Sequence, residues 1–188
     1  MNRDKRKMKS IRLFVGLPIE SLELAEQLTA LTLNNPIPGY KWTKTENFHI
    51  TLCFIGNVDS GRITEIDKAL TNFKMERFLL QPDKIKPVFR RKKLEMIWLT
   101  FKENVSFSAC YNNLHTLLSV QQNHPPTAHL TLARVKPGYL KELTEQDFPD
   151  LSKHEFEASK FHLYESRPTP NGILYVPLKV YNFVPQTP

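Results

Sequence analysis

The chain has 188 residues, 40% of them hydrophobic and 24% charged, and its 26 Lys and Arg against 19 Asp and Glu give a net charge of +7. No apolar run reaches the roughly 18–20 residues that a membrane helix needs, and the two cysteines fit no zinc or disulfide spacing. The composition is that of a globular protein with its own core. These features argue against a membrane protein and a cysteine-rich scaffold. We expect a cytoplasmic protein whose positive charge favours a polyanionic partner.

The spacing of apolar residues predicts a mixture of helices and strands. An apolar run over 11–16 and a β-rich stretch over 48–55, which is expected to stop at Gly56, predict two buried strands. Helical spacing is found over 20–33 and 59–73. The later expected elements are strands over 78–80, 85–89 and 96–101, a helix over 105–120, a strand over 128–135, and a closing antiparallel pair over 156–164 and 174–183. The absence of a strict strand–helix alternation favours an α+β fold with antiparallel sheets.

Basic residues are concentrated in two places. Five of the first ten residues are Lys or Arg, which predicts a flexible basic tail over 1–10. A second run lies between two predicted strands and consists of Arg90, Arg91, Lys92 and Lys93. This run is expected in a loop, where it is either solvated or in contact with phosphate groups.

A short sequence repeat is the most informative feature of the chain. His49-Ile50-Thr51-Leu52 recurs 80 residues later as His129-Leu130-Thr131-Leu132. With six histidines in the chain, a chance duplication of this kind is expected on the order of once in a thousand such sequences. Each copy lies in a predicted strand. Two similar halves that bring their motifs together across a groove are the simplest architecture that explains the repeat.

Side chains alternate between the two faces of a strand, so the histidine and threonine of each motif point to the same side. Two such strands facing each other place two imidazoles and two hydroxyls around one small group. One histidine can take a proton from water while the other protonates a leaving oxygen, because the free pKa of histidine is near 6.5. The pattern predicts cleavage of a phosphodiester by His49 and His129, with Thr51 and Thr131 donating to the phosphate oxygens.

Arg134 follows the second motif, and its planar fork of donors is suited to a phosphate. Cys53 shares the strand face of His49 by parity, and we expect it to fill the core or the cleft wall. A metal site is the alternative use of the histidines. No carboxylate lies beside either motif at ligand spacing, which argues against a metal site.

The segments around the motifs resemble the 2H phosphoesterase superfamily, and within it the RNA 2′,3′-cyclic phosphodiesterases, a family also described as 2′–5′ RNA ligase-like. The resemblance begins at Ile11, covers nearly the whole chain, and is carried by IRLFVGLPI, KWTKTENFHITLCFIG, LEMIWLTF, AHLTLARVK and FHLYESRPTPNGILYVPLKVYNF. It implies one domain over 1–188 with motif halves centred on 49–52 and 129–132. The implied fold is bilobal α+β, with two quasi-repeated lobes, each an antiparallel sheet flanked by helices, and the active site in the groove between them.

By this resemblance His49 is the general acid that protonates the leaving 3′ oxygen, and His129 is the base that positions water. Thr51, Thr131 and Arg134 would hold the phosphate. The implied substrate is RNA with a 2′,3′-cyclic phosphate end, converted to a 2′-phosphate without a metal or a cofactor. Because the sequence shows no obvious apolar patch, we expect a monomer. The sequence leaves open 2′–5′ RNA ligation, hydrolysis of a small cyclic nucleotide, and a non-enzymatic module that binds RNA ends.

Overall fold

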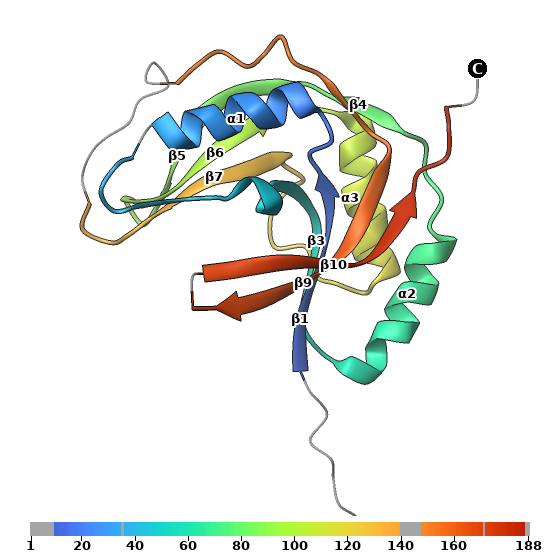
Figure 1. The fold of residues 1–188 in the computed structure, drawn as a ribbon. Coiled ribbons are helices and arrows are strands. Elements are labelled where there is room, and N and C mark those ends of the chain that lie inside the picture. The colour runs from blue at the N-terminus through green and yellow to red at the C-terminus, as the bar shows by residue number, and fades with distance from the viewer. Residues whose placement is uncertain (1–9, 35, 140–147, 171, 187–188) are drawn as a thin grey trace, which may run out of the picture.

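The computed structural model describes residues 10–34, 36–139, 148–170 and 172–186 (Figure 1). Except for Ser10, the expected basic tail lies outside the described residues. The helices are α1 (Leu22–Asn34), α2 (Ile63–Asn72) and α3 (Val105–Leu117). The strands are β1 (Ser10–Pro18), β2 (Tyr40–Trp42), β3 (His49–Asp59), β4 (Phe78–Leu80), β5 (Pro82–Arg90), β6 (Lys93–Phe101), β7 (His129–Val135), β8 (Phe156–Ala158), β9 (Lys160–Thr169) and β10 (Gly172–Asn182). The predicted α+β class with antiparallel sheets is confirmed.

Across the described residues, an eight-stranded sheet runs in the order β10-β9-β1-β3-β7-β6-β5, with β2 beside β7, and β4 and β8 form a separate ladder. The sheet has two halves of four strands. In the paired residues that the structure describes, the halves meet at a single pair, Ile50 with Leu130. Both side chains are fully buried in the core. The two halves of the sheet are therefore joined through the two repeated motifs themselves.

The two halves are not successive segments of the chain. β1 pairs with β3 on one side and with β9 on the other, so strands near both ends of the chain build one half. The other half contains β2, β5, β6 and β7. The repeat therefore describes how the two halves are arranged in space, but each half is assembled from separate pieces of sequence.

The helices are also exchanged between the halves. In sequence α3 lies between β6 and β7, yet it packs against β3 in the other half. It connects β6 to β7, and because β7 adjoins β3 the connection crosses over β3, burying Phe107, Cys110 and Leu114. Figure 1 places α1 at the end of the molecule that holds β5, β6 and β7.

Two predicted boundaries are wrong. β3 does not stop at Gly56 but continues to Asp59, since glycine accommodates the positive φ of 85° at this position without breaking the strand. The stretch 156–164 is not one partner of a hairpin. Its first part, β8, pairs with β4, and only β9 pairs with β10. Within the described residues, no helix is long and apolar enough to cross a membrane.

Candidate active site

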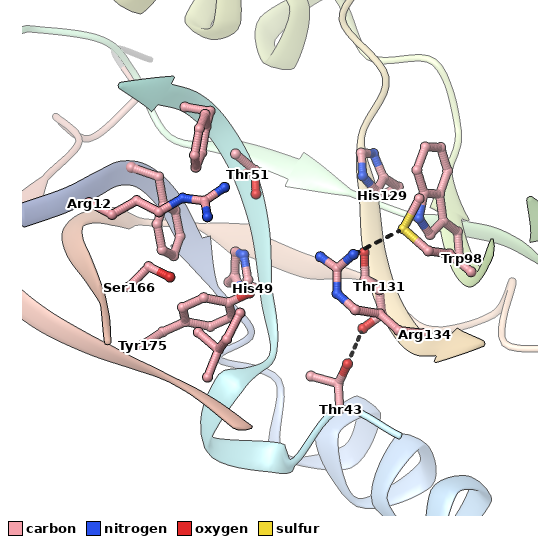
Figure 2. A pocket seen from close by; sticks show the side chains of 14 residues that line it. Arg12, Thr43, His49, Thr51, Trp98, His129, Thr131, Arg134, Ser166 and Tyr175 are labelled. Atoms are coloured by element: carbon pink, nitrogen blue, oxygen red, sulfur yellow. Dashed lines mark hydrogen bonds between the residues drawn. The ribbon is translucent and has the colours of Figure 1, made fainter. Parts of the chain in front are cut away.

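The central pair of the sheet places both motifs on one face. Ile50 and Leu130 point into the core, so the residues on either side of them point to the opposite face. All four predicted motif side chains line one cavity of about 320 Å³, namely His49, Thr51, His129 and Thr131. Figure 2 shows the two histidines on opposite sides of this catalytic cavity, one on each strand. Each copy of the repeat thus contributes one half of the site, a histidine and a threonine, and the two half-sites face each other.

Strand alternation changes immediately after each motif. The register between β1 and β3 passes from Val15–Cys53 to Gly16–Thr51 and skips Leu52, which is a β-bulge. The register between β6 and β7 passes from Ile97–Ala133 to Trp98–Thr131 and skips Leu132 in the same way. The two copies therefore share an irregular backbone as well as a sequence pattern.

The bulges decide which later side chains reach the cavity. Cys53, expected on the face of His49, is instead fully buried in the core, and Phe54 lines the cavity in its place. The parity argument for Cys53 is wrong on this point, because the extra residue reverses the alternation. The equivalent residues of β7 behave alike, since Ala133 is buried and Arg134 lines the cavity. Phe54 and Arg134 thus occupy corresponding positions in the two halves.

Each histidine is oriented by a backbone carbonyl two residues upstream. His49 Nδ1 lies 2.7 Å from the carbonyl oxygen of Asn47, and His129 Nδ1 lies 2.9 Å from that of Thr127. A carbonyl oxygen only accepts, so Nδ1 carries the proton in both rings. Nε2 is then the nitrogen available for proton transfer. Both imidazoles are held in the same tautomer.

His49 is surrounded by aromatic rings. Its ring centroid lies 4.7 Å from that of Tyr175, 4.9 Å from that of Phe14 and 6.0 Å from that of Tyr164. Burial lowers the pKa of His49 to about 4, and the positive charges of His129 and Arg134 act in the same direction, whereas the Asn47 carbonyl opposes them. A pKa this low makes His49 neutral at pH 7.

His129 has a different environment. Its ring stacks on the indole of Trp98, with centroids 3.7 Å apart and planes 19° from parallel. Burial lowers the pKa of His129 below 6.5, the Thr127 carbonyl opposes this shift, and the charge of Lys86 adds to it. Trp98 also lines the cavity. The sequence did not indicate this contact, because Trp98 lies about 30 residues before the second motif.

Arg134 lines the cavity, as its placement at the end of the motif strand suggested. Its Nη1 lies 3.7 Å from the Met96 sulfur, a weak contact that leaves most of its donors for another acceptor. Thr43, on the segment after β2, donates its hydroxyl to the carbonyl oxygen of Thr131 at 2.7 Å and lines the same cavity (Figure 2). These contacts hold the end of β7 in place.

A second arginine at the cavity was not predicted. Arg12 on β1 lies with its guanidinium carbon 4.8 Å from the centre of the Phe54 ring, and both side chains line the cavity. Where β7 carries Arg134, β3 carries Phe54, and Arg12 supplies a cation over that ring from the neighbouring strand. The sequence contained one signal for it, a lone charge within the apolar run over 11–16.

Asn47 links the first motif to β10. Its side chain is buried, donates from Nδ2 to the carbonyl oxygen of Ile173 at 2.9 Å, and accepts from the backbone N–H of Tyr175 at 3.0 Å. Its backbone carbonyl oxygen accepts the hydrogen bond from Nδ1 of His49. One residue therefore fixes both the imidazole and the strand that carries the aromatic Tyr175.

The remaining chemistry-bearing residues lie elsewhere. In the part of the chain that the structure describes, no three His, Cys, Asp or Glu side chains gather closely enough to hold a metal ion. Both cysteines are buried and unbridged. The basic run from Arg90 to Lys93 forms the turn between β5 and β6 and lines neither the catalytic cavity nor the two cavities beside it. Its contact with RNA stays a prediction.

Comparison with known proteins agrees with this geometry. Residues 19–95 match the family model described as "LigT like Phosphoesterase". An "RNA 2′,3′-cyclic phosphodiesterase" of Methanocaldococcus jannaschii is 29% identical over 90% of this chain and 99% of its own length. A protein of the same name from Thermotoga maritima is 31% identical over 73% of this chain and 76% of its own length. The crystal structure of Escherichia coli LigT in apo form superimposes with a TM-score of 0.78 at 21% identity, covering 95% and 99% of the two chains.

The antiparallel α+β fold and the matches to known proteins are those of a phosphoesterase. The chain belongs to the LigT-like phosphoesterase family of the 2H superfamily. The resemblance that the two motifs indicated is confirmed, and the protein is an enzyme.

Proposed function

We propose that the protein hydrolyses the terminal 2′,3′-cyclic phosphate of RNA to a 2′-phosphate. The convergence of both motifs and Arg134 on one cavity is the observation that carries this proposal. The names of the M. jannaschii and T. maritima relatives support the substrate class. In this reaction a water oxygen bonds to phosphorus and the bond from phosphorus to O3′ breaks. One molecule of water is consumed, and the 3′ oxygen leaves as a hydroxyl.

The two histidines share the proton transfers. His129 Nε2 takes a proton from the attacking water, and His49 Nε2 gives its proton to O3′. With its pKa lowered to about 4, His49 is neutral at pH 7, so it must gain a proton when substrate binds. The phosphate supplies the cause, because an anion placed beside an imidazole raises its pKa. Binding of the substrate thus favours protonation of its general acid, His49. After each turnover, proton exchange with solvent returns both histidines to their starting protonation states.

The remaining polar side chains hold the phosphate. Thr51 and Thr131 each lie on the same strand face as one histidine, where a hydroxyl can donate to a non-bridging oxygen. Arg134 from β7 and Arg12 from β1 each place a guanidinium at the cavity, and Arg12 lies over Phe54, the residue of β3 that corresponds to Arg134. We assign both arginines to the charge that develops on these oxygens in the transition state. None of these roles requires a metal ion.

The test is an assay of an oligonucleotide ending in a 2′,3′-cyclic phosphate, carried out in EDTA. We expect conversion to the 2′-phosphate to be unaffected by the chelator. His49→Ala and His129→Ala should each lower kcat/KM by two to four orders of magnitude, roughly the range for a general acid or base. The double variant should be little worse than either single one, because the two act as a unit.

Other outcomes separate the competing functions. Loss of activity in EDTA would replace the proposal with metal catalysis, and wild-type rates in both single variants would remove the histidines from the mechanism. Formation of a 2′–5′ bond after addition of an oligonucleotide with a free 5′ hydroxyl would reveal ligation. The monomeric state and the cytoplasmic location expected from the sequence stay predictions.

A further inference from the structure

Two further cavities with aromatic side chains in their lining open on the catalytic cavity from opposite sides. A third cavity shares Arg12, Ser166 and Ile173 with the catalytic cavity, but its described lining offers no aromatic ring for a base to stack on. The first, here called the Trp42 cavity, has a volume of about 390 Å³ and shares Thr43, Arg134, Ile173 and Tyr175 with the catalytic cavity. The second, here called the Tyr111 cavity, has a volume of about 710 Å³ and shares Thr51, Phe54, Trp98 and His129 with it. No residue lines both flanking cavities. Figure 2 accordingly shows Thr51 and Thr43 at opposite ends of the catalytic cavity.

The two flanking cavities differ in charge. Lys41, Lys44 and Arg134 contribute three cations to the Trp42 cavity, against the single carboxylate of Glu46, which pairs with Lys44 at 3.7 Å. The lining of the Tyr111 cavity includes no Lys, Arg, Asp or Glu among the described residues. An internucleotide phosphate is therefore favoured in the first cavity and not in the second.

Trp42 gives the cationic cavity a stacking surface. The indole is half-buried, packed against the core on one side, and it lines the cavity beside the exposed Lys41 and Lys44. Aromatic rings beside cations are the usual means of holding single-stranded nucleic acid without reading its sequence, because every base has a face to stack. A volume near 390 Å³ is also within the range of sites that hold small ligands.

The chemistry of the substrate requires two binding directions, which the Trp42 and Tyr111 cavities provide. In a nucleoside 2′,3′-cyclic phosphate, the base is attached next to the carbon that bears O2′. The 5′ carbon, which leads to the preceding nucleotide, is attached next to the carbon that bears O3′. With the phosphate held between the histidines, the base and the 5′ extension leave the site in opposite directions. Each direction requires a cavity of its own.

We propose that the Trp42 cavity binds the nucleotide on the 5′ side of the cyclic phosphate, while the terminal base occupies the Tyr111 cavity. This inference rests on the proposed function. It places O3′ on the side of the Trp42 cavity, whose lining includes Asn47 and Tyr175, two of the residues in contact with His49. The general acid then lies next to the oxygen that it protonates. The enzyme acts on RNA ends in preference to mononucleotides.

The experiment compares kcat/KM for a dinucleotide that ends in a 2′,3′-cyclic phosphate with kcat/KM for the corresponding mononucleotide. We expect wild type to favour the dinucleotide roughly tenfold to hundredfold, the gain typical of one stacked base. Trp42→Ala should bring this ratio close to one, and Trp42→Phe should retain part of it. Lys41→Ala with Lys44→Ala should lower the ratio most at low salt. Lys68→Ala with Lys74→Ala, on and just after α2, is the matched control and should leave the ratio unchanged.

Each alternative result has a distinct meaning. A ratio of one in wild type, or an unchanged ratio in Trp42→Ala, would overturn the inference while leaving the proposed function standing. Loss of the ratio in Tyr111→Ala but not in Trp42→Ala would put the 5′ nucleotide in the other cavity, which also overturns it. Hydrolysis of neither substrate by wild type would overturn the proposed function and this inference together.

Discussion

The two motif strands carry the same pattern and share three structural features, yet their histidines lie in different surroundings. Both rings donate from Nδ1 to a carbonyl two residues upstream, both strands bulge at the motif leucine, and both motifs line one cavity. His49 is enclosed by Phe14, Tyr164 and Tyr175, whereas His129 stacks on Trp98. The local sequence sets the tautomer and the direction of each ring. Neighbouring strands set its proton affinity.

The cations of the two halves differ in origin. Arg134 comes from the motif strand itself, while the equivalent position of β3 holds Phe54 and the charge comes from Arg12 on β1. A repeated site can therefore keep a function at corresponding places without keeping the residue. Four experiments compare the two half-sites.

Removal of the arginines should have the largest effect. We expect Arg134→Ala to lower kcat/KM by about a hundredfold to a thousandfold, the loss typical of removing one donor to a developing oxyanion. Arg134→Lys should recover only part of it, because an ammonium cannot reproduce the planar fork. Arg12→Ala should cost about tenfold, since its side chain is exposed and lies over Phe54. Equal losses in the two alanine variants would show that the half-sites are energetically equivalent.

The pH dependence should reveal the effect of bound phosphate on the histidines. In the free enzyme the pKa of His49 is near 4 and that of His129 is below 6.5. One ring must be protonated, so kcat/KM should fall about tenfold per pH unit once the pH passes the higher of the two free-enzyme pKa values. The anionic substrate raises both pKa values, and the alkaline limb of kcat should therefore lie at higher pH than that of kcat/KM. Coincident limbs would show that substrate binding leaves the histidines uncharged.

Trp98 should act on His129 alone. A ring face stabilises the imidazolium, so Trp98→Leu should lower the pKa of His129 and move the alkaline limb of kcat/KM down by up to about one pH unit. Trp98→Phe retains an aromatic face and should move the limb less. A ¹H–¹⁵N NMR titration of the two imidazoles would assign the shift. Movement of the His49 titration instead would contradict the assignment.

Asn47 should affect stability more than chemistry. Asn47→Ala leaves the Ile173 carbonyl and the Tyr175 N–H without their partner, which should cost about 1–3 kcal/mol in the free energy of unfolding, measured in urea. Asn72→Ala removes an exposed side chain to backbone hydrogen bond on α2 and serves as the control. We expect that change to cost less than about 0.5 kcal/mol. Equal costs would mean that Asn47 does not secure β10.

Much of the site could be predicted because it lies within two short segments. A strand that alternates between faces brings the histidine and threonine of one motif together, and the repeat indicated that the two motifs would meet. Phe54 was missed because a bulge, invisible in the apolar pattern, reverses the alternation after Leu52. Arg12, Trp98 and Tyr175 were missed because each reaches the cavity from a strand far away in sequence.

The sequence by itself determined most of the elements, the two His-x-Thr motif strands and the family, since these depend on local spacing and on residue identity. Only the tertiary structure decided that strands from both ends of the chain share one half of the sheet, that α3 covers β3, and that the two histidines differ in pKa. The physical reason is that strand pairing, burial and charge act between residues far apart in the chain. A pattern within one segment carries no record of which segments will lie beside it.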